Sequence, residues 1–174
     1  SLTFNYRNYY KTNRQYNVRI FAGKFFKNNT TDDYFSFSSF RARDYLFGSN
    51  LLGRSENSGF YSQQYIGSEG GFKSKINYEY ANDYIISLNS GITVWQWIEG
   101  YTGIAAIKNI NEDLIFQYES GIRLNLFTDY FELYFPVYSS LGNELNQTNY
   151  LSKIRFKISL DPDTLSSLFT RRWF

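Results

Sequence analysis

FQYESGIRLN, the stretch of residues 116–125, alternates between two kinds of side chain along its length. One set is mostly apolar, as in Phe116 and Ile122, and the other includes the charged Glu119 and Arg123. Successive side chains of an extended chain point to opposite faces. The pattern therefore predicts a β-strand with one apolar face and one polar face.

The same period of two recurs along the chain and predicts an all-β, antiparallel protein. Near the C-terminus, Ile154, Phe156 and Ile158 are expected on the apolar face, with Arg155 and Lys157 on the polar face. About nine strands are expected, at approximately residues 2–10, 16–26, 33–40, 60–77, 83–97, 100–108, 113–126, 130–139 and 151–160.

The character of these strands favours a transmembrane β-barrel. Mean hydropathy is −0.45, and no apolar run reaches the ~20 residues that a membrane-spanning helix needs. A barrel strand needs only about 9–11 residues, with every second one facing lipid. Bacterial single-chain barrels usually have an even strand count, so we expect a tenth strand in residues 41–59 or more strands from a preceding part of the polypeptide. A start at Ser1 without a signal peptide is expected of a processed product or a fragment.

Aromatic residues support the same interpretation. They make up 21% of the chain, with 17 Tyr and 17 Phe, and Tyr and Trp favour sites with one apolar and one wet side. Several lie near the ends of expected strands. We expect interface anchors at Trp95, Trp97, Tyr101, Trp173 and Phe174.

Several kinds of chemistry are not expected. The chain has no Cys, Met or His, so the commonest metal ligands and the Ser-His and Cys-His nucleophile pairs are missing. No enzyme activity, cofactor or metal is expected. The net charge of +2 is too balanced to suggest a nucleic-acid partner. Residues 67–71 (GSEGG) match no phosphate-binding loop and predict a bulge or a close backbone approach within a strand.

Charged residues on the polar faces define a candidate structural site. In a barrel these side chains point into the lumen, where we expect cross-strand ion pairs or contact with water. A structural ion-pair network is expected more than a substrate-selective channel. The residues expected in this network are Arg19, Glu119, Arg123, Glu132 and Arg155.

Connection lengths predict an orientation. Tight turns are expected at Glu99-Gly100 and at Thr128-Asp129, and longer polar connections at residues 108–113 and 140–149. Outer-membrane barrels have short periplasmic turns and long external loops, so the C-terminus is expected in the periplasm of a bacterial outer membrane. Residues 1–160 would form the barrel strands. Residues 161–174 predict a short amphipathic helix at the periplasmic interface.

Several stretches resemble the C-terminal region of large Bacteroidetes-type outer-membrane proteins that have a gluzincin-like metallopeptidase domain upstream. The resemblance implies a segment that helps to embed the whole protein in the outer membrane. The zinc site of that family uses an HExxH helix, and since this chain has no His, no residue of that site transfers to it. The similar stretches are residues 18–26 (VRIFAGKFF), 53–56 (GRSE), 69–75 (EGGFKSK), 129–139 (DYFELYFPVYS), 153–165 (KIRFKISLDPDTL) and 168–174 (LFTRRWF).

Three functions remain open at this stage. The first is a membrane anchor or scaffold of a larger surface protein, in contact with the lipid bilayer, lipopolysaccharide and other parts of the polypeptide or other outer-membrane subunits. The second is a transport pore with a selective lumen. The third is a soluble, aromatic-rich β-sandwich that binds glycans, which would need aromatic residues clustered on one concave face.

Overall fold

The computed structural model describes residues 1–11, 14–29, 35–40, 59–127 and 130–158. It is an all-β protein built on one large antiparallel sheet. In spatial order, the strands of the main path are β1 (Leu2–Lys11), β2 (Arg14–Lys24), β5 (Tyr84–Trp95), β6 (Ile98–Lys108), β7 (Ile115–Phe127), β8 (Phe131–Ser139) and β10 (Arg155–Ile158).

Shorter elements complete the described structure. The two-residue strand β9 (Gly142–Asn143) pairs with β8, and β3 (Phe37–Ser38) pairs with β4 (Tyr80–Ala81) in a separate small sheet. The 3-10 turns are η1 (Phe60–Gln63), η2 (Glu144–Asn146) and η3 (Tyr150–Lys153). Within the described ranges, no helix has the length and apolar character needed to cross a membrane.

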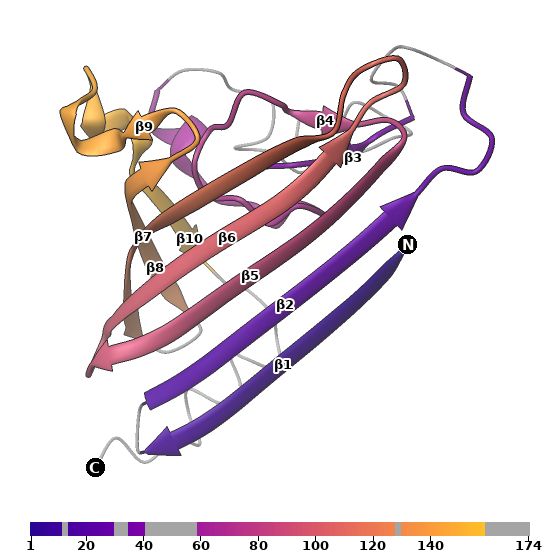
Figure 1. Ribbon diagram of the computed structural model, residues 1–174. Coiled ribbons are helices and arrows are strands. Elements are labelled where there is room, and N and C mark those ends of the chain that lie inside the picture. Colours follow the sequence, from indigo (N-terminus) through magenta and orange to yellow (C-terminus); the bar gives the residue numbers. More distant parts are fainter. Residues whose placement is uncertain (12–13, 30–34, 41–58, 128–129, 159–174) are drawn as a thin grey trace.

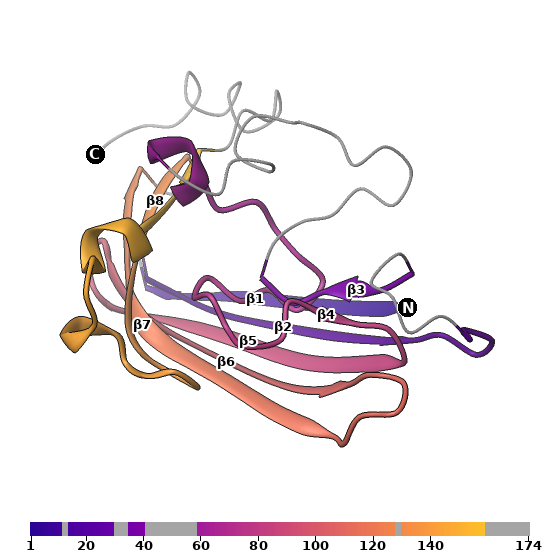
Figure 2. The same cartoon turned by 90° about the horizontal axis from the view of Figure 1, so that it is seen from above.

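The main sheet is strongly curved. Figures 1 and 2 show β1, β2, β5 and β6 side by side, while β7, β8 and β10 bend over to one side. Of the chain between β2 and β5, the described part from η1 to β4 crosses the concave face of this sheet (Figure 2). The sheet therefore has a convex face and a concave face that is covered by part of its own chain.

The sequence alternation produces the difference between these two faces. Along β5, Ile86 and Leu88 are exposed on the convex face, whereas Ser87 and Asn89 are buried on the concave face. Register continues the pattern across the sheet, because Ile104 of β6 lies opposite Leu88.

An apolar core fills one end of the concave face. It lies where the ends of β2, β5 and β6 meet the small β3–β4 sheet and the chain between η1 and β4. Phe37 packs on Phe21 with ring centroids 5.7 Å apart. The buried members are Phe21, Phe37, Phe40, Phe72, Ile76, Ala81, Ile85, Ala105 and Ile107.

Three of the expected strands were wrong in extent or type. The one expected over residues 151–160 starts in η3, and strand is present only over Arg155–Ile158 among the described residues. Residues 60–77 form η1 and an irregular segment, and of residues 33–40 only Phe37–Ser38 is strand among those described. The cause is that backbone groups of residues 67–76 bond to side chains and loops on the concave face. Lys73 N–H, for example, donates to the Glu119 carboxylate at 2.9 Å.

The expected turn at Glu99-Gly100 was also misplaced. Both residues lie inside β6, and the turn falls between Trp95 and Ile98, where Gln96 adopts a left-handed φ of 36°. Glu99 pairs across the sheet with Arg123. Glu99 belongs to a strand because its backbone position is paired on both sides, with Thr93 of β5 and Arg123 of β7.

The described strands form an open sheet, so the expected closed barrel is not seen in them. Within these ranges β1 pairs only with β2. At the other edge β10 pairs with β8 and makes one isolated bridge between Phe156 and Gln64. Figure 1 shows β1 at one margin of the sheet and β8 and β10 at the other, with β2, β5, β6 and β7 between them. The helix expected over residues 161–174 and the strand expected over residues 41–59 lie outside the described residues, except for Gly59.

The two ends of the sheet differ in the length of their connections. The links β1–β2, β5–β6 and β7–β8 each span only a few residues and lie at one end of the sheet. The links β6–β7 and β8–β10 are longer and lie at the other end, where the long link β2–β5 also begins and ends. Because β10 is antiparallel to β8, it runs toward the end with the short links.

Candidate functional site

The candidate site is the polar part of the concave face and the chain segment that lies on it. We call residues 67–76 the inner segment. Three carboxylates from the sheet are buried here and make hydrogen bonds, namely Glu99 of β6, Glu119 of β7 and Glu132 of β8. Buried carboxylates are stable only when donors or cations compensate them.

Glu119 binds the inner segment through its main chain. Its two carboxylate oxygens accept the backbone N–H of Lys73 at 3.0 and 2.9 Å, and one of them accepts the N–H of Ser74 at 2.6 Å. The Lys73 ammonium lies 3.9 Å from the same carboxylate. Backbone hydrogen bonds to an ionised acceptor are stronger than neutral ones, so Glu119 holds the inner segment in place.

The Lys73 ammonium lies among aromatic rings. Its Nζ is 5.7, 5.6 and 6.0 Å from the ring centroids of Tyr65, Tyr101 and Tyr134, and it donates to the Gly71 carbonyl at 2.7 Å. Burial lowers the pKa of Lys73 from 10.5 to about 8, although Glu119 acts in the opposite direction. Burial also raises the pKa of Tyr65.

A second set of charges runs across four strands. Arg123 contacts the carboxylates of both Glu99 and Glu132, the latter at 3.5 Å, and its guanidinium lies 5.9 Å from the ring centroid of Tyr134. Lys157 of β10 completes the series by bonding to Glu132 at 3.2 Å. The charges therefore alternate acid, base, acid, base from β6 to β10.

Glu99 has further uncharged partners on its own end of the sheet. Gln15 and Thr93 each donate to one of its oxygens at 3.1 Å, and Asn125 donates at 3.3 Å. These donors come from β2, β5 and β7. With the cation of Arg123, which is also on β7, the buried carboxylate has four partners from three strands.

Two glycines allow the inner segment to approach the sheet. Gly71 has a φ of +77°, and a Cβ there would lie 2.7 Å from Asn89 Nδ2 and 2.8 Å from Arg19 NH1. A Cβ on Gly70 would lie 2.6 Å from the Ser39 carbonyl oxygen. The close approach expected for residues 67–71 is therefore present, but it occurs in a loop instead of a strand.

The five residues expected in a lumen network all contact the concave side, with different partners. Arg123 and Glu132 are paired with each other, whereas Glu119 contacts Lys73. Arg19 donates to the Glu69 carbonyl at 2.8 Å, and Arg155 donates to the Ser62 carbonyl. The two arginines therefore hold the β2–β5 connection through its backbone.

The expected interface anchors are separated by the structure. Trp95 and Trp97 are 65% and 54% exposed at the β5–β6 turn. Tyr101 does not lie beside them, because the period of β6 turns its ring toward the concave face, where it is buried against Tyr134. Trp173 and Phe174 are outside the described residues.

The C-terminal strand only partly follows the expected faces. Lys157 lies on the concave side, as its bond to Glu132 shows, and Ile158 is exposed. Phe156, however, is buried. Its strand is bridged on the outer edge by Gln64, and Tyr65 N–H donates to the Phe156 carbonyl.

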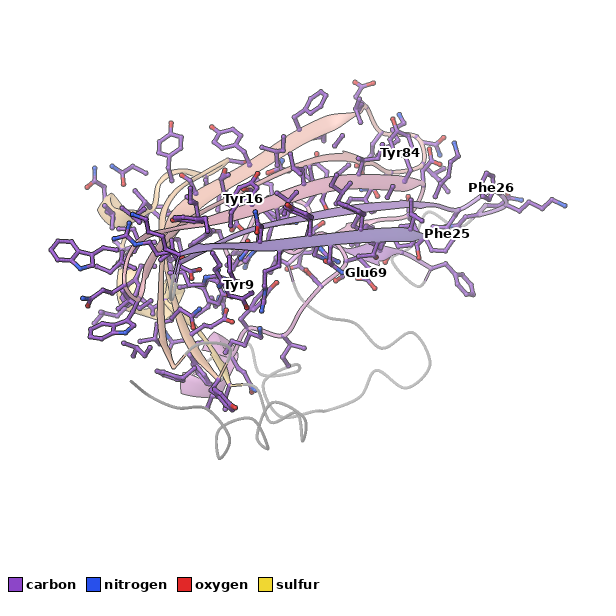
Figure 3. All side chains as sticks on the ribbon, turned by 90° about the horizontal axis from the view of Figure 1, so that it is seen from below. Tyr9, Tyr16, Phe25, Phe26, Glu69 and Tyr84 are labelled. Carbon is purple, nitrogen blue, oxygen red and sulfur yellow. The ribbon has the colours of Figure 1, made fainter. Side chains whose placement is uncertain are left out.

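The convex face is apolar and exposed. Figure 3 shows Tyr16 and Tyr84 on the side of the sheet opposite to Glu69, near opposite ends of the strands. Between these ends, aliphatic and aromatic side chains continue from strand to strand. The large exposed ones include Ile20, Ile86, Leu88, Ile92, Ile104, Phe116 and Ile122.

Sequence reasoning missed two central residues. Glu99 was assigned to a turn, and Lys73 was placed in a strand that does not form. Glu99 could have been found from alternation, because Glu99, Tyr101 and Gly103 share one face of β6. No alternation pattern pointed to Lys73, because its position depends on contacts between the inner segment and β7.

The site is suited to holding the inner segment and offers few reactive groups. Its buried carboxylates accept hydrogen bonds or form ion pairs with cations. Among the described residues, no three His, Cys, Asp or Glu side chains are grouped as metal ligands. Comparison of the chain with protein-family models, curated proteins and solved structures gave no significant match.

Proposed function

We propose that this chain forms part of a bacterial outer-membrane β-barrel and acts as a membrane anchor or scaffold of a larger surface protein or complex. The single observation that supports this most is the polarity of the two faces. Glu99, Glu119 and Glu132 are at most 4% exposed, whereas Ile104 and Phe116 are 52% and 71% exposed.

A protein in water usually buries its apolar side chains and exposes its charged ones, and this sheet does the opposite. Large exposed apolar patches on a protein in water are costly and mark an interaction surface. Hydrocarbon would make the same convex face favourable, at about 25 cal/mol for each Å² of apolar surface removed from water. The strands are also long enough, since β5 has 12 residues and a tilted barrel strand needs about 9–11.

The free edge of β1 supports the presence of further strands in the assembled barrel. All ten residues of β1 are exposed, and in the described part of the chain it pairs on one side only. In lipid each unpaired backbone group costs several kcal/mol, so an open edge is not tolerated there. The strands that close the barrel would come from the rest of the polypeptide or from another outer-membrane subunit.

The ends of the sheet support an orientation for this barrel. The short links and the exposed Trp95 and Trp97 lie at the end toward which β10 runs. In outer-membrane barrels short turns face the periplasm, and aromatic residues lie at the interface. We therefore propose that this end is periplasmic and that the longer links face the lipopolysaccharide leaflet.

The inner segment favours an anchor over an open pore. It lies on the concave face and is held there by Glu119, Asn89 and Arg19. The glycan-binding alternative would need accessible aromatic rings on this face, but Tyr101 and Tyr134 are buried.

Heat-modifiability of the full polypeptide tests the proposal. A folded membrane barrel resists SDS at room temperature, so the unboiled sample is expected to migrate differently from the boiled one. A sample unfolded in urea before loading is the control and is expected to migrate like the boiled sample. A protein that is monomeric and soluble without detergent would overturn the proposal. Steady single-channel current in a planar bilayer would favour the pore instead of the anchor.

A further inference from the structure

The concave face has a half-open cavity of about 380 Å³ next to the inner segment. It lies between β1, β2 and β5 on one side and Tyr65, Gly71 and Lys73 on the other. This volume is within the range of small-molecule sites, which is about 300–1,000 Å³. The inner segment therefore fills only part of the concave face.

The described lining of the cavity has five cations and one acid, and two of the cations, Lys73 and Arg123, also contact Glu119 and Glu99 outside the lining. Among the described residues that form it, Glu132 is the single acid. It is already in contact with Arg123 and Lys157. The cations of the lining come from five different elements and are Arg7, Arg19, Lys73, Arg123 and Lys157.

Two of these cations are close neighbours on the strand side. Arg7 of β1 lies opposite Asn17, and Arg19 of β2 lies opposite Asn5, so the two arginines occupy diagonal positions on one face of the pair. Diagonal positions on one face of a sheet lie about 7–8 Å apart, within reach of long side chains. The Arg19 guanidinium donates to the Glu69 backbone carbonyl and lies 5.6 Å from the ring centroid of Phe21. Both of these contacts are with uncharged groups.

We propose that this cavity binds a small organic anion through its carboxylate or phosphate group. Arginine forms paired hydrogen bonds with both groups, and convergent cations lower the energy of an anion most where solvent is partly excluded. An anion between Arg7 and Arg19 would be within reach of both side chains. Anion binding is a function beyond the anchor role. It depends on the fold of the concave face and not on insertion into a membrane.

The uncharged part of the lining indicates hydroxyl groups on the same ligand. Asn5, Asn17 and Ser90 supply donors and acceptors beside the two arginines. Amides and hydroxyls match sugar hydroxyls. A sugar phosphate or sugar acid therefore fits better than a purely apolar acid.

Calorimetric titration of the full protein in detergent tests the proposal. The probes are glucose 6-phosphate, inorganic phosphate and glucose. Glucose 6-phosphate is expected to bind most tightly, phosphate more weakly and glucose not measurably, and added salt is expected to weaken the binding of both anions. Absence of anion binding, or equal binding of glucose, would overturn the proposal.

Two variants locate the site. Arg19→Gln and Arg7→Gln are each expected to weaken glucose 6-phosphate binding about tenfold or more, because each removes a charge-assisted contact. Lys24→Gln is the control, because Lys24 is an exposed cation of β2 that is not in the lining. Equal weakening by the control would indicate non-specific attraction and reject the site.

Folding is checked separately from binding. Each variant is run with and without boiling in SDS, so that a misfolded protein is recognised before titration. Arg7 is exposed on the edge strand, so its variant is expected to fold even if Arg19→Gln does not. If the wild type binds anions but shows no heat-modifiability, the membrane proposal fails and the cavity proposal stands.

Discussion

Lys73 and Glu119 are 46 residues apart in the chain, and both oxygens of the Glu119 carboxylate accept the backbone N–H of Lys73. The Lys73 ammonium returns to within 3.9 Å of the same carboxylate. One carboxylate of β7 thus binds both the main chain and the side chain of one residue of the inner segment. The attachment of that segment to the sheet depends on this pair.

Glu119→Gln is expected to destabilise the fold by about 3–5 kcal/mol, because it leaves the buried Lys73 cation without its counter-charge. The new amide also places an NH₂ group against backbone donors. Urea unfolding of the detergent-solubilised protein, followed by tryptophan fluorescence, measures the change. Glu112→Gln in the exposed β6–β7 link is the control and is expected to change stability by less than about 0.5 kcal/mol. Similar values for the two variants would contradict the role of the pair.

The pH dependence of stability is expected to report the burial of Lys73. Its folded pKa of about 8 lies below the ordinary 10.5. Between these two values the unfolded state binds more protons, so the free energy of unfolding rises with pH in this window. Below about pH 8 this contribution is lost, because the ammonium is then charged and buried. The groups that face Lys73 are Tyr65, Tyr101, Glu119, Arg19, Arg123, Glu132 and Tyr134.

Lys73→Met tests this assignment. The methionine cannot titrate, so the rise in unfolding free energy between about pH 8 and 10 is expected to become smaller. Lys75→Met changes an exposed lysine of the same segment and is expected to keep the wild-type slope. The comparison is made from urea midpoints across this pH range. An unchanged slope in Lys73→Met would show that another group titrates.

Ile104→Arg tests whether the convex face contacts lipid. Ile104 is near the middle of β6 and is 52% exposed, so an arginine there would lie close to the bilayer midplane and cost about 2–4 kcal/mol. Val94→Arg, on the same face near the end of β5, is expected to cost only about 0–1 kcal/mol. The measurement is reversible unfolding in lipid vesicles. If both variants are nearly neutral, the face is in contact with water.

Gly71→Ala tests the close approach of the inner segment. At Gly71 and Gly59 the φ angles are +77° and +78°, so a left-handed backbone costs an alanine about 1–2 kcal/mol at either position. At Gly59 a Cβ meets nothing within 4 Å, whereas at Gly71 it meets Asn89 and Arg19. Gly71→Ala is therefore expected to lower the free energy of unfolding by about 1–3 kcal/mol more than Gly59→Ala does. Equal urea midpoints for the two variants would contradict the tight contact.

Much of the sheet was predictable because strand alternation is local. The expected strands over residues 2–10, 83–97, 113–126 and 130–139 correspond to β1, β5, β7 and β8 within a few residues. Each of these strands pairs with a neighbour over most of its length, so its side chains keep a period of two except at a few bulges. The expectation failed at residues 60–77, where the backbone bonds to side chains and loops on the concave face.

The candidate site was predictable only in part. Alternation placed Arg123 and Glu132 on one face, and they form an ion pair. It could not assign partners, because partners depend on register and on what covers the face. Lys73 was therefore missed as the cation of Glu119, and the ring of Tyr101 was expected at an interface instead of on the concave side.

The sequence by itself determined that this protein is built from β-strands with one apolar and one polar face, because an extended backbone turns successive side chains to opposite sides. Only the tertiary structure decided that the inner segment lies on the polar face and that Lys73 meets Glu119. These contacts join residues far apart in the chain, and they depend on strand register and loop packing, which a local pattern does not encode.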